Sequence, residues 1–308
     1  MSLALTASLR QISGSRHALL ARWLGLALSA HSRTESSVMK AIELRNVAIL
    51  GLGEAGSEMA RDLLRAGVRV RGYDPNPTRT VEGIEHARDE ADAARGTQLV
   101  LSVNWSRVSL DVARRVQPVL VPEQVYAEMN TSAPAKKAAV AQILDPNALV
   151  ADVALMSPVP GKGIRTPMFV SGPGAQRFVA LMHAFGSPIA LLEGDVGIAA
   201  SRKLARSVFD KGLAAAVGEA LEAAALLGAD AERALRGDII RTLMATDAST
   251  VDRLHEGTRL HAVRREEEMA AAADMLRALR LEPIMAEATR AWLARFAATG
   301  RDATDART

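Results

Sequence analysis

Three glycines at residues 51, 53 and 56 stand between a short apolar run and an amphipathic segment. They form the G-x-G-x-x-G pattern of a dinucleotide-binding turn, which is weak evidence unless a strand precedes it and a helix follows. The first glycine permits the tight turn, the second lets a pyrophosphate approach the backbone, and the third lets the helix pack on the strand. Free N–H groups and the positive end of the helix dipole then face the phosphates. The expected cofactor contacts in this turn are Gly51, Leu52, Gly53, Glu54, Ala55 and Gly56.

An acidic residue follows at the distance that this type of turn requires. Asp74 lies 18 residues beyond Gly56, close to the roughly 20 expected of the acid that accepts hydrogen bonds from the adenosine ribose. A carboxylate there repels a 2′-phosphate, so Asp74 favours NAD over NADP. Arg79 is an alternative anion contact if its loop curls back, and otherwise it is a solvated arginine of a turn.

The surrounding pattern alternates strands with helices, as a parallel sheet requires. Strands are expected at 46–50, 68–73, 98–103, 125–129, 149–153, 168–171 and 189–192. Helices are expected between them at 58–65, 84–95, 107–115, 134–143 and 175–184. After residue 196 only helices are expected, at 198–227, 231–244, 260–279 and 284–298. The prediction is an α/β, Rossmann-type, doubly wound and mostly parallel sheet at 41–194, followed by an all-α domain at 195–300 for substrate binding and dimerisation.

Composition excludes several classes of function. Lys and Arg number 38 against 35 Asp and Glu, so a formal charge of +3 gives no strong field for nucleic acid or acidic lipid. The chain has no cysteine, which rules out disulfides and thiolate chemistry. No His, Asp and Glu stand at metal-ligand spacing. We therefore expect no metal, no nucleic-acid partner and no membrane partner.

The first forty residues differ from the rest. Residues 1–34 contain no acidic residue but four arginines among many Ser, Ala and Leu, the composition of an amphipathic transit peptide. Alternatively this extension is an over-called start, since Met39 immediately precedes the first residues of the expected domain. The chain is accordingly expected in the cytoplasm, or in the mitochondrial matrix if the extension is a transit peptide.

Three segments together resemble the β-hydroxyacid dehydrogenases related to 6-phosphogluconate dehydrogenase and 3-hydroxyisobutyrate dehydrogenase. They are the glycine turn within 47–60, Asn130-Thr-Ser-Ala-Pro134, and the glycine-rich stretch at 194–203 that ends in Lys203. The resemblance covers most of 42–298. It implies that Thr131 contacts the nicotinamide ribose, that Val103 borders the cofactor, and that Lys203 is the catalytic lysine.

The position of Lys203 is compatible with that role. A lysine near the start of a long helix lies at the positive end of the dipole, which disfavours its charge and lowers its pKa toward the working range. The amine would take the hydroxyl proton while hydride leaves the same carbon, and would return it in the reverse direction. A lysine here also argues against the related imine reductases, in which this position is commonly another residue.

The expected substrate region departs from the family pattern. Ser207 stands where the family usually has asparagine, and the strand-end segment reads Asp152-Val-Ala-Leu-Met-Ser-Pro-Val159 in place of the usual glycine-rich loop. Ser157 keeps a plausible carboxylate contact beside Met156, and Arg202 or Arg206 would assist with an anionic substrate. These departures resemble a less characterised subgroup, so the hydroxy acid cannot be inferred from better-known members.

The leading hypothesis is an NAD(P)-dependent dehydrogenase that acts on the CH–OH group of a small, anionic hydroxy acid. The alternatives are a non-catalytic, nucleotide-binding regulatory protein and a reductase of imines or carbonyls. A homodimer is expected, because the alanine-rich helix at 199–227 is apolar on too many faces for one partner.

Overall fold

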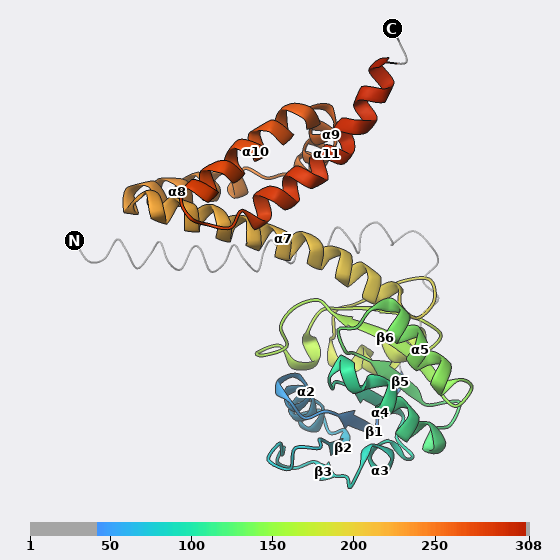
Figure 1. Ribbon diagram of the computed structural model, residues 1–308. Coiled ribbons are helices and arrows are strands. Elements are labelled where there is room, and N and C mark those ends of the chain that lie inside the picture. The colour runs from blue at the N-terminus through green and yellow to red at the C-terminus, as the bar shows by residue number, and fades with distance from the viewer. Residues whose placement is uncertain (1–41, 306–308) are drawn as a thin grey trace, which may run out of the picture. The chain divides into compact units, whose positions relative to one another are not determined.

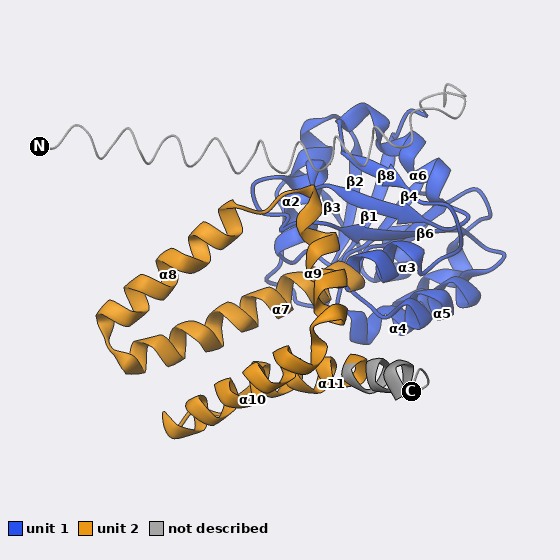
Figure 2. Ribbon diagram, turned by 90° about the horizontal axis from the view of Figure 1, so that it is seen from above, with its two compact units in different colours: residues 1–204 blue, residues 205–308 orange. Residues whose placement is uncertain are grey.

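The computed structural model describes residues 42–305, with side chains described as far as residue 296. These residues form two compact units that divide between Leu204 and Ala205 (Figure 2). The extension at 1–40, with its transit-peptide or over-called-start interpretation, lies outside the described residues. The expected domain boundary near Gly194 stays a prediction.

The first unit is built on one sheet. Within the described residues its strand order is β3-β2-β1-β4-β5-β6-β7-β8. Figure 1 labels β1, β2, β3, β5 and β6 in this sheet. All neighbouring strands are parallel except β6 and β7, which are antiparallel. This arrangement confirms the mostly parallel, doubly wound sheet. The strands are β1 (Asn46–Leu50), β2 (Arg69–Tyr73), β3 (Glu85–His86), β4 (Leu99–Ser102), β5 (Val125–Glu128), β6 (Leu149–Leu155), β7 (Met168–Ser171) and β8 (Ile189–Leu191).

The strand order reverses direction beside β1. From β1 the chain passes to β2 on one side, and it later returns to form β4 on the other side of β1. Helices that leave β1 and β4 therefore cover opposite faces, and a crevice opens at the carboxyl ends of these strands. In open α/β sheets this crevice is where ligands bind.

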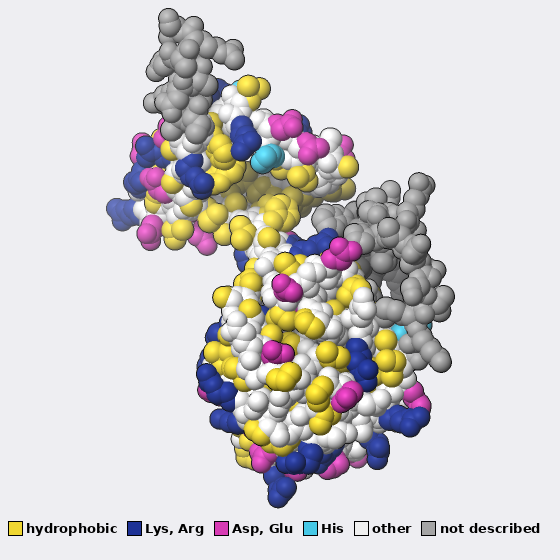
Figure 3. Space-filling view, turned by 90° about the vertical axis from the view of Figure 1, so that its right-hand side faces the viewer, with side chains coloured by type: hydrophobic (Ala, Val, Ile, Leu, Met, Phe, Trp, Pro, Cys, Tyr) yellow, Lys and Arg dark blue, Asp and Glu magenta, His cyan; other side chains and the backbone are white. Residues whose placement is uncertain are grey.

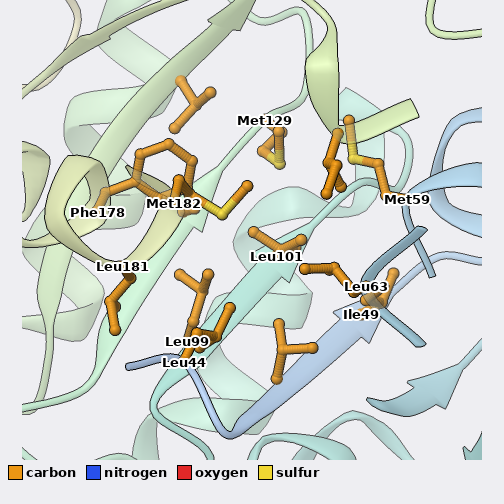
Figure 4. Close-up of a cluster of buried hydrophobic side chains, with 14 of the residues drawn as sticks. Leu44, Ile49, Met59, Leu63, Leu99, Leu101, Met129, Phe178, Leu181 and Met182 are labelled. Atoms are coloured by element: carbon orange, nitrogen blue, oxygen red, sulfur yellow. The ribbon is translucent and has the colours of Figure 1, made fainter. Parts of the chain in front are cut away.

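Helices cover both faces of the sheet, each over its own apolar core. On one face α2 (Glu54–Arg65) and α6 (Ala175–Met182) pack on the sheet, and Figure 4 shows their Met59, Leu63 and Phe178 among strand side chains. The other face is covered by α3 (Glu90–Ala94), α4 (Ser109–Val116) and α5 (Pro134–Leu144). Short 3-10 turns lie at Ser106–Val108, Gln117–Val119, Gly163–Arg165 and His183–Phe185. Burial on both faces explains why the central strands read as continuous apolar runs.

The prediction of a helix at 84–95 is wrong for the first half of this range. Residues Glu85 and His86 instead pair with β2 as strand β3. The helix begins only after Asp89, whose side chain accepts a hydrogen bond from the backbone N–H of Asp92 at 2.6 Å. This N-cap fixes the first residue of α3, so pairing with the sheet edge and the cap together override the apparent helical pattern.

The second unit is entirely helical within its described residues. The long helix α7 (Ile198–Leu227) has the expected bounds and continues from the first unit into the second. It is followed by α8 (Ala229–Met244), α9 (Ala248–Leu260), α10 (Ala262–Ala278) and α11 (Ile284–Asp305). The sequence-based assignment missed α9, which starts at a capping box formed by Asp247 and Thr250. In the described part of the chain, every helix is too short or too polar to cross a lipid bilayer.

Candidate active site

A cavity of about 610 Å³ lies at the carboxyl ends of β1, β2 and β4, where the strand order reverses. The glycine turn forms one wall, the loop after β2 forms a second, and the loop after β4 forms a third. Its lining includes the expected residues Gly51, Gly53, Glu54, Ala55, Asp74 and Val103. The cavity therefore joins most of the residues that the sequence assigned to the cofactor.

The glycine turn is shaped by two close backbone approaches. Gly51 has a φ of +103°, and a Cβ atom there would lie 2.6 Å from the carbonyl oxygen of Val103. A Cβ atom on Gly56 would lie 1.9 Å from the carbonyl oxygen of Gly51. A Cβ atom on Gly53 would instead have the Nη1 of Arg79 as its nearest neighbour, at 3.6 Å. Two glycines thus allow the corner to close, and the third leaves its backbone accessible, as a pyrophosphate requires.

Asp74 holds this corner together. One carboxylate oxygen accepts the N–H of Leu52 at 2.9 Å, and the other accepts the N–H of Asn76 at 2.9 Å. Its side chain is only 4% exposed. The side chain of Leu52 belongs to the apolar core, so Leu52 serves the turn through its backbone alone. Asp74 therefore fixes the glycine turn against the loop that follows β2.

The loop after β2 does curl back toward the glycines. Arg79 reaches over them, with its Nη1 3.3 Å from Asp74 Oδ2, and it lines the cavity. A cation thus lies beside the open backbone of Gly53. The residues present fit a nicotinamide dinucleotide, since backbone amides, a carboxylate and an arginine face one cavity of sufficient size.

In the wall that follows β4, sequence reasoning predicted Val103 and missed the residues after it. Asn104, Trp105 and Arg107 follow β4 and line the cavity. The guanidinium of Arg107 lies 4.9 Å from the centre of the Trp105 ring, and the Trp105 side chain is 61% exposed. An exposed tryptophan beside an arginine offers a flat, cationic surface to a nucleotide. The available signal was their position just beyond the carboxyl end of a central strand, as for Asp74.

A second, narrow pocket of the first unit brings Lys203 and Thr131 together. The Nζ of Lys203 donates a hydrogen bond to Thr131 Oγ1 at 2.8 Å. Lys203 is half-buried in the first turns of α7, and Thr131 follows the end of β5. The pocket is lined by Asn130, Thr131, Ser132, Lys137, Ala154, Ala200, Lys203 and Leu204. The amine therefore faces the strand-end segment that the sequence paired with it.

Side-chain hydrogen bonds connect the two pockets. The Nδ2 of Asn130 donates to Glu128 Oε2 at 2.7 Å and to Asn104 Oδ1 at 3.0 Å. Asn104 lines the cavity, and Asn130 lines the narrow pocket. Burial raises the pKa of Glu128 to about 7, although the charge of Lys137 acts to lower it. A buried carboxyl group with a raised pKa thus accepts a hydrogen bond from Asn130, the residue that joins the two pockets.

The loop with Ser157 has a cation of its own. The Nζ of Lys162 donates to Ser157 Oγ at 2.9 Å. Carboxylates of α2 hold the same loop, with Glu58 accepting the N–H of Gly161 at 3.0 Å and Asp62 that of Ile164 at 3.1 Å. Ser157 therefore offers a hydroxyl beside a lysine, a combination that suits an anion and that sequence reasoning missed because the lysine stands five residues further on.

The remaining expected substrate residues do not line either pocket. Met156 is half-buried, its N–H donates to the carbonyl of Pro167 at 2.8 Å, and neither Met156 nor Ser157 lines the narrow pocket. Arg206 and Ser207 belong to the second unit, where Arg206 pairs with Asp210 at 3.4 Å. Arg202 stacks over the ring of Phe169, 4.3 Å from its centre. Among the described residues no group of three His, Asp or Glu side chains is placed to hold a metal ion.

Family comparisons agree with this geometry. Residues 46–161 match the NAD binding domain of 6-phosphogluconate dehydrogenase, and residues 228–296 match a domain of unknown function, DUF1932. The first unit thus carries an NAD-binding domain of the 6-phosphogluconate dehydrogenase type, and a DUF1932 domain follows it in the chain. This confirms the family expected from the sequence, and with it a nicotinamide dinucleotide as the cofactor.

Individual relatives extend the likeness over most of the chain. An uncharacterized 28.5 kDa protein of Methanothermus fervidus is 24% identical over 79% of this chain and 96% of its own length. The conserved protein MTH1747, whose structure resembles 3-hydroxyacid dehydrogenases, is 27% identical, with a TM-score of 0.55 over 82% of this chain and 96% of its own. An imine reductase from Aspergillus terreus, solved with a nicotinamide cofactor, shares the fold at 17% identity, with a TM-score of 0.69 over 84% of this chain and 96% of its own.

Proposed function

We propose that this chain is an NAD(P)-dependent oxidoreductase that transfers hydride between the nicotinamide and the hydroxyl-bearing carbon of a small hydroxy acid. The observation that carries the proposal is the hydrogen bond from Lys203 to Thr131 at 2.8 Å. It places an amine at the carboxyl edge of the same sheet that carries the cofactor cavity. The family match supports the cofactor, and the lysine supports alcohol chemistry.

The role assigned to each residue follows from its contacts. The turn at 51–56 and Arg79 would hold the pyrophosphate, Asp74 would face the adenosine ribose, and Thr131 would face the nicotinamide ribose. The bound cofactor supplies the acceptor or donor of hydride. With one N–H engaged by Thr131, the amine of Lys203 in its neutral form takes the proton of the substrate hydroxyl. The protonated amine returns that proton when a carbonyl is reduced.

An anionic substrate is the natural partner of this region. Ser157 offers its hydroxyl next to Lys162, with 2.9 Å between Oγ and Nζ, and a lysine and a hydroxyl together bind a carboxylate well. Ser157 and Lys162 would bind the carboxylate of the substrate, and Met156, Arg206 and Ser207 are predicted to be further substrate contacts. NAD is the favoured cofactor because of Asp74, and Arg79 and Arg107 provide cations for the phosphate of NADP.

A substrate panel with a lysine variant tests the proposal. Hydroxy acids, including aldonates and phosphorylated ones, are assayed at 340 nm with NAD and with NADP, alongside imines and carbonyl compounds without an acid group. Lys203→Met should lower kcat by about 10²- to 10⁴-fold, the usual contribution of general acid–base catalysis, while the dissociation constant of NADH changes less than about twofold.

Three outcomes contradict the proposal in different ways. Equal turnover by Lys203→Met removes the lysine mechanism. Preferential reduction of imines or neutral carbonyls assigns the protein to that class of reductase. NADH binding without oxidation of any member of the panel supports a nucleotide-binding regulatory protein.

A further inference from the structure

Lys137 and Asp152 form an ion pair inside the first unit. Lys137 Nζ lies 2.9 Å from Asp152 Oδ1, and the two side chains are 1% and 0% exposed. Lysine and aspartate are rarely buried so completely. Because removing both charges from water costs much of what their attraction returns, well-packed apolar residues often stabilise a fold equally well. Stability by itself is therefore a weak explanation of this pair.

Asp152 holds the start of the helix that carries Lys203. Its second oxygen, Oδ2, accepts the backbone N–H groups of Gly197 and Ala200, both at 2.9 Å. These are donors of the first turn of α7, which have no partner within the helix, and the carboxylate also lies at the positive end of the helix dipole. Lys203 follows Ala200 by less than one turn. Asp152 thereby fixes where the amine of Lys203 projects.

Lys137 holds the end of β5, next to Thr131, which accepts the hydrogen bond from Lys203. Its Nζ donates to the carbonyl oxygen of Glu128 at 2.7 Å, and a second donation reaches the carbonyl of Val153 at 3.4 Å. Glu128 is the last residue of β5, and the segment with Thr131 leaves the sheet immediately after it. Lys137 also lines the narrow pocket beside Lys203. One buried ion pair is therefore attached to both ends of the Lys203–Thr131 hydrogen bond.

We propose that Lys137 and Asp152 are positioning residues that set the Lys203 amine against Thr131. The inference rests on the proposed role of Lys203. Asp152 fixes the first turn of α7, Lys137 fixes the end of β5, and the ion pair between them holds these two elements at one separation. Neither residue takes part in proton transfer itself.

The position of the Lys203 amine can be followed without a substrate. Lysine is scarce in this chain and occurs at Lys40, Lys136, Lys137, Lys162, Lys203 and Lys211. Reductive methylation with ¹³C-formaldehyde labels the solvent-accessible amines, which excludes the 1% exposed Lys137, and Lys203→Arg identifies the Lys203 resonance. Asp152→Asn should make this resonance narrower and move it toward that of the exposed Lys211. The reason is that the asparagine N–H₂ and the Lys137 ammonium are both hydrogen-bond donors, so the ion pair that connects α7 to β5 is lost.

Two further variants separate positioning from folding. Lys137→Met combined with Asp152→Asn leaves no unpaired buried charge and retains an acceptor for the helix N–H groups, yet the link between α7 and β5 is gone. We expect the Lys203 resonance to move in this double variant also. Lys136→Met is the matched control, since the Lys136 amine donates to the carbonyl of Ser106 at 3.1 Å and has no part in the ion pair; its Lys203 resonance should stay in place.

Activity provides the second measurement. In Asp152→Asn and in the double variant, kcat should fall by about 10²-fold, the effect of a displacement near 1 Å at a reacting group, while NADH binding changes less than about twofold. An unmoved Lys203 resonance in both variants overturns the inference, as does an equal movement in Lys136→Met. If the resonance moves but the wild-type protein oxidises no hydroxy acid, the positioning stands and the proposed function fails.

Discussion

In the first unit, hydrophobic side chains on both faces of the sheet form two extensive buried cores. Among the described residues of the helical unit, the buried core cluster is smaller, with three alanines and one leucine against which Met269, Leu279 and Leu281 pack. The helical unit depends more on polar contacts. Glu219 of α7 accepts the N–H groups of Met285 and Ala286 at 2.7 and 2.8 Å, and Arg290 pairs with Glu266 at 2.8 Å. Figure 3 shows hydrophobic side chains gathered on the surface of this unit.

The two units differ in how much of their hydrophobic surface is buried within the chain. The sheet buries both of its faces within one chain, so the first unit resembles an ordinary self-sufficient domain. The helix α8 has no buried residue, and Ile240, Leu243 and Met244 are 51%, 44% and 81% exposed on one stripe of it. An apolar stripe of this kind typically meets another protein surface. We therefore propose that a second copy of the chain covers the helical unit.

The largest expected effect comes from closing the space at the glycine turn. In Gly56→Ala the new methyl group would meet the carbonyl oxygen of Gly51 at 1.9 Å, and backbone cannot move aside as a flexible side chain can. The substitution should lower the free energy of unfolding by about 3 kcal/mol or more and weaken NADH binding at least tenfold, roughly 1.4 kcal/mol. Urea unfolding and NADH fluorescence titration measure the two effects.

The helical unit supplies a matched control for this substitution. Gly218 also lies within a helix, but a Cβ atom there meets nothing within 4 Å. Gly218→Ala should raise the free energy of unfolding by about 0.5–1 kcal/mol through helix propensity and leave NADH binding unchanged. A destabilised Gly218→Ala, or a neutral Gly56→Ala, would remove the contrast between the two units.

Next in size is the change in assembly expected when the apolar stripe receives a charge. The wild-type chain should have the mass of a dimer, and Ile240→Asp should shift the population toward the mass of one chain, because burying an unpaired carboxylate is costly. Light scattering after size-exclusion chromatography measures this mass. Ala234→Asp, on another face of α8, should leave the dimer intact. A monomeric wild-type chain would refute the proposed dimer.

A further effect, which is absent near pH 4 and grows as the pH rises, tests the polar interior of the first unit. Glu128 has a pKa of about 7 in the folded chain against an ordinary value of 4.5. Between these values the folded state binds a proton that the unfolded state has released, so the wild-type chain loses stability as the pH rises through this window. A glutamine carries no charge to bury. Glu128→Gln should thus equal the wild-type chain near pH 4 and exceed it at pH 8 by up to roughly 3 kcal/mol.

Urea unfolding of both proteins at a series of pH values measures this difference. Because all other groups are common to the two proteins, their contributions cancel in the comparison. A difference that is constant between pH 4 and pH 8 would contradict the raised pKa of Glu128. A difference that grows with falling pH would show that the charged form is the favoured one.

Much of the first unit could be predicted from residues that act locally. The turn at 51–56 carries its own geometry, since Gly51 adopts a φ of +103° and Gly56 allows the close approach of the helix. The apolar runs of the central strands predicted the buried sheet. The first half of the helix predicted at 84–95 was wrong because residues there pair with the sheet edge. The helix α9 was missed although it starts at the capping box of Asp247 and Thr250.

The sequence by itself determined the glycine turn, the sheet with its helices on both faces, and the bounds of α7, because strand and helix periods and glycine backbone freedom are properties of neighbouring residues. Only the tertiary structure decided that Arg79 and Trp105 share one cavity with Gly53, and that Lys137 meets Asp152. These contacts join residues far apart along the chain. Their geometry depends on how strands are ordered in the sheet, and no local pattern of residue types records that order.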